Sequence, residues 1–155
     1  MRNSGSTVDQ LRVANIGLVK RFIQAINDSW NIDEMRELVS DDFVFVIPFA
    51  PTWFKVRYEG RQQALAFLDS VRDLMDPENL YDLRIDTCAA DPCDVIAEYR
   101  SATRMKGTGL PYCNDYIGRF RIRDGRIACF AEYLDPTRFV IAIGGTVNPP
   151  ATIST

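Results

Sequence analysis

The feature that most constrains the fold is a hairpin pattern in the last third of the chain. In residues 116–134, YIGRFRIRDGRIACFAEYL, polar and apolar residues alternate on both sides of Asp124-Gly125. Alternation places successive side chains on opposite faces of a strand, and Asp-Gly is a strong signal for a two-residue turn. The pattern predicts two paired strands, 112–123 and 126–134, each with one face turned to the core and the other to solvent.

Three further segments are predicted to be strands. They span residues 43–47, 80–88 and 94–105, and the last two stand directly before the hairpin. Consecutive strands that follow one another through short turns, with no helix between them, favour an antiparallel sheet.

Three segments in the first half carry apolar residues at the spacing of an amphipathic helix. They span residues 8–27, 31–39 and 61–75. Because an amphipathic helix must bury its apolar stripe, we expect all three helices to cover one face of the sheet. The sequence therefore predicts an α+β fold, an antiparallel sheet with a helical lid.

The length of 155 residues fits one domain with a single core. The composition, 46% apolar and 25% charged, is that of an ordinary globular protein and argues against a disordered or fibrous one. We predict a single domain over residues 1–155, with an ordered core of about 8–143 and a loosely held tail at 144–155.

Charge and hydropathy exclude two classes of partner. The net charge is -3, and lysines and arginines are scattered along the chain, which disfavours a nucleic-acid partner. No run of 18 apolar residues is present, and the first ten residues, MRNSGSTVDQ, lack the apolar core of a signal peptide. We therefore expect a cytoplasmic protein without a membrane partner.

The absence of histidine narrows the chemistry further. It removes the commonest general base and the common zinc site, so acid–base chemistry falls to carboxylates, tyrosines or lysines. No carboxylate cluster has the spacing of a metal site, and we expect neither a metal nor a cofactor. The four cysteines could form two disulfides, but buried free thiols are the default expectation in a reducing compartment. They are Cys88, Cys93, Cys113 and Cys129.

Strand alternation predicts which side chains face the helices. The inward face is apolar at one end and polar at the other, where five polar residues lie at similar levels on three neighbouring strands: Tyr99, Ser101, Asn114, Tyr116 and Glu132. The apolar wall is predicted to consist of Phe45, Ile47, Phe67 and Phe130, with Trp53 at the mouth. Apolar walls with a few convergent polar groups are typical of a small-molecule pocket.

Glu132 stands between Phe130 and Leu134 on the inward face. An ionised carboxylate in such a place is costly unless it is paired, so its pKa is expected to rise, and a raised pKa suits a general acid or base near neutral pH. The alternative is structural. In that case Glu132 pairs with one of three arginines and stabilises the sheet, namely Arg100, Arg104 or Arg138.

The other polar residues of the inward face have weaker predicted roles. Tyr99 and Tyr116 could donate hydrogen bonds to a developing oxyanion, or could simply pack in the core. Asn114 could contact a substrate or bond to backbone, and Ser101 could orient the substrate.

Three stretches of the sequence carry a family resemblance: LVSDDFVF, YEGRQQALAFL and YIGRFRIRDGRIACFAEYLDPTRF. Together they resemble the nuclear transport factor 2-like, or ketosteroid isomerase-like, superfamily over almost the whole chain. Within it, the chain is most similar to SnoaL-like polyketide cyclases and phenazine-biosynthesis-like proteins. The resemblance implies a curved antiparallel sheet wrapped by three helices into a cone with an internal pocket, and a homodimer formed through the outer face of the sheet.

The resemblance also implies a chemistry. In phenazine-biosynthesis-like members a glutamate matching Glu132 acts as acid or base on a small bound intermediate, although the histidine of that family falls at Phe67 here. In epoxide hydrolases of the fold the acidic residue works with an arginine and an aspartate, and those places hold Tyr99 and Ser101.

We therefore expect a cofactor-independent enzyme of the isomerase or cyclase type, with Glu132 transferring a proton on a largely apolar carbonyl compound. The sequence leaves a second class open, a non-catalytic module of the same fold that binds a small ligand or mediates dimerisation. An epoxide hydrolase fits less well.

Overall fold

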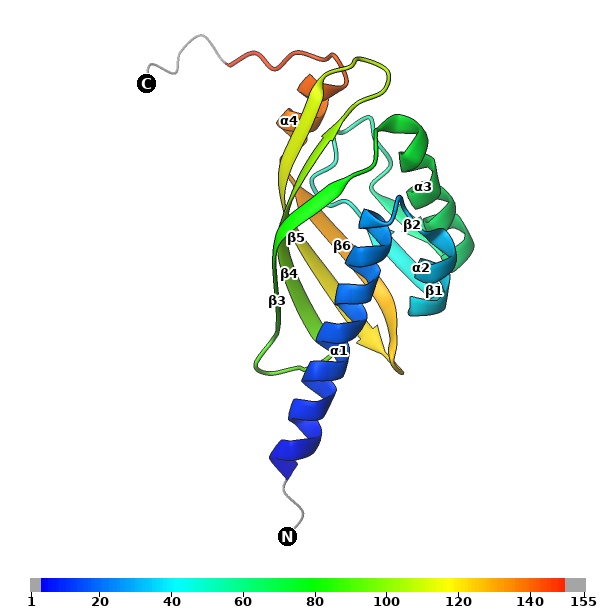
Figure 1. The fold of residues 1–155 in the computed structure, drawn as a ribbon, viewed down its shortest axis with the longest axis vertical. Helices are drawn as coiled ribbons and strands as arrows, with labels where there is room; N and C mark the ends of the chain where they lie inside the picture. The colour runs from blue at the N-terminus through cyan, green and yellow to red at the C-terminus, as the bar shows by residue number, and fades with distance from the viewer. Residues whose placement is uncertain (1–3, 150–155) are drawn as a thin grey trace.

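The structure is a computed structural model that describes residues 4–149. Four helices and six strands lie in this range, in this order: α1 (Ser4–Asn27), α2 (Ile32–Leu38), β1 (Val39–Val46), β2 (Arg57–Glu59), α3 (Arg61–Leu74), β3 (Asn79–Thr87), β4 (Asp94–Arg104), β5 (Pro111–Arg123), β6 (Arg126–Leu134) and α4 (Pro136–Ala142). Figure 1 shows α1 lying across one face of the curved sheet, with α2 and α3 beside it. The predicted α+β class is confirmed.

The sheet is mixed, with the strand order β2-β1-β6-β5-β4-β3. β1 and β6 run parallel, whereas every other neighbouring pair is antiparallel. The prediction of an entirely antiparallel sheet was therefore wrong at one pair. The connection from β1 to β6 is not a hairpin: the chain passes through β2, α3 and the meander β3–β5, and it returns beside β1 in the same direction.

Two elements were absent from the sequence prediction. β2 has only three residues, too few for alternation to be recognised. α4 begins directly after β6, where Asp135 accepts a hydrogen bond from the Thr137 backbone N–H and Pro136 occupies the first turn. An acidic N-cap followed by proline is a helix-start signal. The predicted lid of three helices is thus completed by a fourth, which packs against β5.

Element boundaries differ mainly at the first helix and the first strand. α1 begins at Ser4 rather than near residue 8, and β1 begins at Val39, so residues 40–42 lie in the strand and not in the predicted turn. Two of these polar residues face solvent and form ion pairs, Asp41 with Arg61 and Asp42 with Arg123. Of the predicted tail, residues 150–155 lie outside the described range.

The alternation that predicted the hairpin is confirmed along β5, where every second residue is buried. Phe120 and Ile122 face the helices, and Arg119 extends outward to Asp94, with an Nη2–Oδ2 distance of 2.6 Å. The core is aromatic at this level, since the stacked rings of Phe120 and Phe130 have centroids 4.3 Å apart. Burial of each such ring contributes roughly 1.5–3 kcal/mol.

All four cysteines are free thiols, and Cys113 is exposed. Within residues 4–149, no helix is long and apolar enough to cross a membrane. In the same part of the chain, no group of three or more histidine, cysteine, aspartate or glutamate side chains could hold a metal ion.

Candidate active site

A cavity of about 270 Å³ lies between the polar end of the sheet and the helices. It is lined by α3, the inner faces of β1, β5 and β6, and α4, together with the α1–α2 connection. Its walls are mostly apolar, and many of the apolar side chains are aromatic: Trp30, Phe45, Phe54, Phe67, Tyr112 and Phe139. The polar groups at the wall include Glu78, Tyr116 and Glu132, and none of the described lining residues is a lysine or an arginine.

Glu132 reaches this cavity because it lies two residues after the buried Phe130 on β6. Its Oε1 accepts a hydrogen bond of 2.6 Å from the Tyr99 hydroxyl. Burial raises the pKa of Glu132 to about 7, and the hydrogen bond from Tyr99 opposes that rise by stabilising the charged form. The carboxyl can therefore hold or release a proton near neutral pH.

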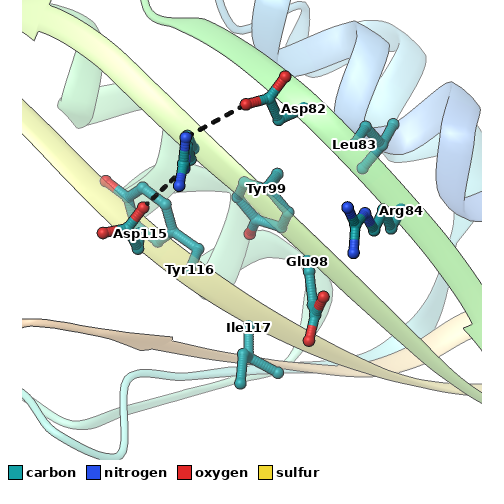
Figure 2. A pocket seen from close by; sticks show the side chains of 9 residues that line it. Asp82, Leu83, Arg84, Glu98, Tyr99, Asp115, Tyr116 and Ile117 are labelled. Carbon is teal, nitrogen blue, oxygen red and sulfur yellow. Dashed lines mark hydrogen bonds and ion pairs between the residues drawn. The ribbon is translucent and has the colours of Figure 1, made fainter.

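The structural alternative, an ion pair between Glu132 and an arginine, does not occur among the described residues. Arg100 pairs with Asp82 and Asp115 on the outer face of the sheet, where Figure 2 shows both carboxylates. Arg138 also pairs with Asp115.

The third candidate, Arg104, donates to the carbonyl of Gly109. All three candidate arginines therefore have other partners, and Glu132 is left with a neutral hydrogen-bond donor.

A chain of hydroxyl groups runs from the cavity wall into the sheet. The Tyr116 hydroxyl is 3.0 Å from the Tyr112 hydroxyl, accepts from Ser101 Oγ at 3.3 Å, and lies 3.4 Å from Glu78 Oε1. Burial is the main cause that raises the pKa of Tyr112 and of Tyr116 well above the ordinary value. These tyrosines therefore remain neutral and can act as hydrogen-bond donors.

Glu78 was not predicted as a site residue. It lies in the connection between α3 and β3, is 8% exposed, and lines the cavity. Burial, and secondly the nearby charge of Glu132, raise its pKa to about 8, whereas hydrogen bonds from Ser101 and Tyr116 lower it. One signal was available in the sequence, because Glu78 and the buried Leu80 share one face of an extended segment.

The predicted polar residues Ser101 and Asn114 support the tyrosines and do not line the cavity. Asn114 Nδ2 donates to the Tyr112 hydroxyl and to the Asp135 carbonyl, both at 3.0 Å, and its Oδ1 accepts from the Asp135 backbone N–H. Asn114 thus ties β5 to the start of α4. The alternative of backbone hydrogen bonding, which the sequence left open, is the one that the structure shows.

The predicted apolar wall is only partly brought together. Phe45 and Phe67 line the cavity, whereas Ile47 and Phe130 are buried in the core beside it. Trp53 is 63% exposed, and its neighbour Phe54 faces the cavity in its place. Phe54 contacts Phe67 and Phe139 edge to face, so this loop closes the cavity through a different aromatic side chain.

Gly118 makes room for this arrangement. It pairs with Glu132 across β5 and β6, and a Cβ atom at this position would lie 2.9 Å from the Phe120 ring, 3.1 Å from the Phe130 ring and 3.3 Å from the Tyr99 ring. Phe120 and Phe130 are fixed by their mutual stacking.

Gly118→Ala is therefore expected to destabilise the protein by about 1–3 kcal/mol, because overpacking forces the rings to shift. Denaturant unfolding against wild type measures the loss. Gly17→Ala is the matched control: its Cβ would meet nothing within 4 Å, and alanine favours the helix. Equal midpoints for wild type and Gly118→Ala would show that the rings are not tightly held.

Comparison with known proteins gives concordant results. A family model described as a SnoaL-like domain matches residues 19–130. The uncharacterised protein YesE of Bacillus subtilis is 34% identical over 112 residues, which is 71% of this chain and 74% of that protein. An uncharacterised PhzA/B-like protein of Pseudomonas aeruginosa is 30% identical over 112 residues, or 70% of this chain and 76% of that protein.

A solved structure from Bacillus subtilis, described provisionally as an isomerase, superimposes with a TM-score of 0.79. The match covers 87% of this chain and 96% of that chain, at 24% identity. This likeness shows a shared fold.

Proposed function

The chain belongs to the SnoaL-like domain family, and from this premise we propose that it is a cofactor-independent small-molecule enzyme of the isomerase or cyclase type. The observation that carries the proposal is Glu132, a carboxyl at the wall of an aromatic cavity with no cationic partner among the described residues and a pKa raised to about 7. A base with a pKa near the operating pH is the group that proton abstraction beside a carbonyl requires.

In the proposed reaction, the Glu132 carboxylate removes a proton from the carbon next to a carbonyl group. The electron pair of the broken C–H bond moves into the enolate, and Glu132 then returns the proton to another carbon. For ring closure, the enolate carbon attacks a second carbonyl carbon of the substrate, the π bond of that carbonyl breaks, and Glu132 gives its proton to the resulting alkoxide. The hydrogen bond from Tyr99 to Oε1 fixes the orientation of the carboxylate.

The donor to the enolate oxygen is proposed to be Tyr112 rather than the tyrosines that the sequence suggested. The Tyr99 hydroxyl already donates to Glu132, and the Tyr116 hydroxyl donates to Tyr112. Tyr112 accepts from Asn114 and from Tyr116 and lines the cavity, so its own proton is available to a ligand oxygen. Preorganised donors of this kind stabilise developing negative charge.

The substrate is proposed to be a small, largely apolar carbonyl compound. A volume of about 270 Å³ is slightly below the usual range of ligand pockets, which begins at roughly 300 Å³, and therefore favours a small substrate. The aromatic wall favours a ring or a short apolar chain, and none of the described lining residues offers a positive charge to an anionic group. The description of one structural relative as an isomerase, and of one sequence relative as PhzA/B-like, supports this class of reaction.

The test is the exchange of the hydrogen next to a carbonyl for deuterium in heavy water, followed by NMR. Cyclohexanone, acetophenone and 2-tetralone are suitable probes, each corrected for exchange without protein. Wild type is expected to accelerate exchange in at least one probe. A ligand that binds in the cavity but shows no exchange and no conversion would favour the non-catalytic binding module.

We further propose that the protein forms a homodimer through the outer face of β3, β4 and β5. This face is hollowed over about 670 Å³ and carries acidic and basic side chains side by side, with Ile117 47% exposed among them (Figure 2). Ile96 is a further exposed apolar residue of the face. In a two-fold interface each surface meets its own copy, so mixed charges of this kind can complement themselves.

Ile117→Asp is expected to convert the dimer into a monomer, because it places a charge in the centre of the proposed interface. Light scattering after size exclusion measures the mass. Val13→Asp on α1, where Val13 is also exposed, is the control and should leave the dimer intact. A wild type with the mass of one chain would contradict the proposal.

A further inference from the structure

We propose that Glu78 is a second catalytic residue of the cavity, which acts as the general acid while Glu132 acts as the general base. This inference rests on the proposed function and extends it, because it assigns the two carboxyls opposite protonation states in one turnover.

Geometry places both groups at the same cavity. Glu78 comes from the connection before β3 and Glu132 from β6, far apart in sequence, yet both line the cavity wall. Tyr116 connects Glu78 with the proposed oxygen donor, since its hydroxyl lies 3.4 Å from Glu78 Oε1 and 3.0 Å from the Tyr112 hydroxyl. Glu78 and Tyr112 both lie beside the Tyr116 hydroxyl and both line the cavity, so the proposal places the ligand oxygen between them.

The surroundings of the two carboxyls contain no compensating positive charge among the described residues. Each element packed around them contributes neutral groups: Tyr99 and Ser101 from β4, Tyr112 and Tyr116 from β5, Ser70 from α3, Phe139 from α4 and Trp30 from the α1–α2 connection. Two carboxylates in such a place repel each other, so the pair retains one proton over part of the neutral range.

The hydrogen bonds indicate which carboxyl keeps that proton. Glu132 accepts a short bond of 2.6 Å from Tyr99, which stabilises its ionised form. Glu78 is 8% exposed, and its contacts with Ser101 and Tyr116, the latter at 3.4 Å, do not offset the effect of burial. The pKa values agree with this order, since that of Glu132 is about 7 and that of Glu78 about 8. The pKa of Glu78 is raised mainly by burial and secondly by the charge of Glu132. Carboxyls whose environments separate their pKa values have separate acid and base roles.

The proposed step balances without a cofactor. The carboxylate of Glu132 takes the proton as the C–H bond breaks, while the O–H bond of Glu78 breaks and a new O–H bond forms on the enolate oxygen. In the second half the enol returns its proton to Glu78, and Glu132 delivers its proton to carbon. Both carboxyls finish in their starting states, and the substrate is isomerised.

The first test is the pH profile of carbonyl-adjacent exchange in the same three ketones. The exchange rate of wild type should give a bell-shaped pH profile with its maximum between the two pKa values, because activity requires an ionised Glu132 and a protonated Glu78. Glu78→Gln should lower the maximal rate about 10²–10⁴-fold and remove the alkaline limb, since no proton can then be lost from this position. Glu37→Gln on α2 is the matched control, and its pH profile should remain bell-shaped. A Glu78→Gln profile with an unchanged alkaline limb would overturn the inference and leave Glu132 as base.

The second test needs no substrate. Carbon-13 NMR of the side-chain carboxyls gives the titration midpoint of Glu78 in wild type and in Glu132→Gln. Removing the charge of Glu132 should lower the Glu78 midpoint below about 8. An unchanged midpoint would show that the two groups do not interact and would overturn the pair. This result does not depend on turnover, so it separates a failure of the pair from a failure of the proposed reaction.

Discussion

Glu132→Gln is expected to lower the rate of exchange beside a carbonyl about 10²–10⁴-fold, the usual contribution of a positioned general base. The amide keeps the size of the side chain, and its oxygen can still accept the hydrogen bond from Tyr99. It cannot take a proton from carbon. Ligand affinity should change only a few fold, because the aromatic wall that holds the substrate is untouched.

Two measurements check this expectation. The exchange rate gives the effect on chemistry, and calorimetric titration with the ketone that exchanges fastest gives the effect on binding. The surface variant Glu37→Gln controls for the loss of one carboxylate from the protein as a whole. If Glu132→Gln exchanges protons at the wild-type rate, Glu132 is not the base.

The same substitution is expected to make the protein more stable at neutral and alkaline pH. The folded-state pKa of Glu132 is about 7, above the ordinary value of 4.5. The folded state therefore binds more protons than the unfolded state between these two pH values, so the free energy of unfolding falls as pH rises through this window. Below pH 4.5 the free energy of unfolding of the wild type is not reduced by Glu132. Above pH 7 it is reduced by the full amount, roughly 3 kcal/mol.

Denaturant unfolding of wild type and Glu132→Gln from pH 4 to pH 9 measures this difference. Glutamine does not titrate, so the advantage of the variant should be smallest near pH 4 and should grow until about pH 7. Glu78 also affects the free energy of unfolding, and it does so in both proteins. Its pKa is expected to be lower in the variant, which also favours the stability of the variant at neutral and alkaline pH. A variant that is less stable than wild type at pH 8, with the deficit shrinking in acid, would indicate a stabilised carboxylate.

Much of the fold could be predicted because its strands are solvated on one side. In β5 each arginine marks the outer face and each intervening apolar residue the inner one, so the orientation of Tyr116 and Asn114 follows from counting. The same counting on β6 places Glu132 among apolar neighbours. Local pattern therefore predicted the hairpin and the residue on which the proposed function depends.

The parts that escaped prediction depend on contacts between distant segments. The parallel pairing of β1 with β6 results from a long connection, which no local pattern records. Glu78 lies outside any regular element, and its burial depends on how the end of α3 packs over the sheet.

Local sequence pattern also failed to predict which residues of a loop line the cavity. Phe54 and Trp53 are adjacent aromatic residues of one loop, and only the path of that loop decides which of them faces inward. Pocket residues contributed by loops are therefore harder to predict than those contributed by strands.

Glu132 is proposed to be a partly buried carboxyl with no cationic partner among the described residues, which exchanges its proton near neutral pH. The most direct test is the carbon-13 NMR titration of the Glu132 side-chain carboxyl in the wild-type protein, with Glu132→Gln to assign the resonance. The expected midpoint is near pH 7. A midpoint at or below the ordinary value of 4.5 would show a stabilised carboxylate and would contradict the proposed role of Glu132 as a base.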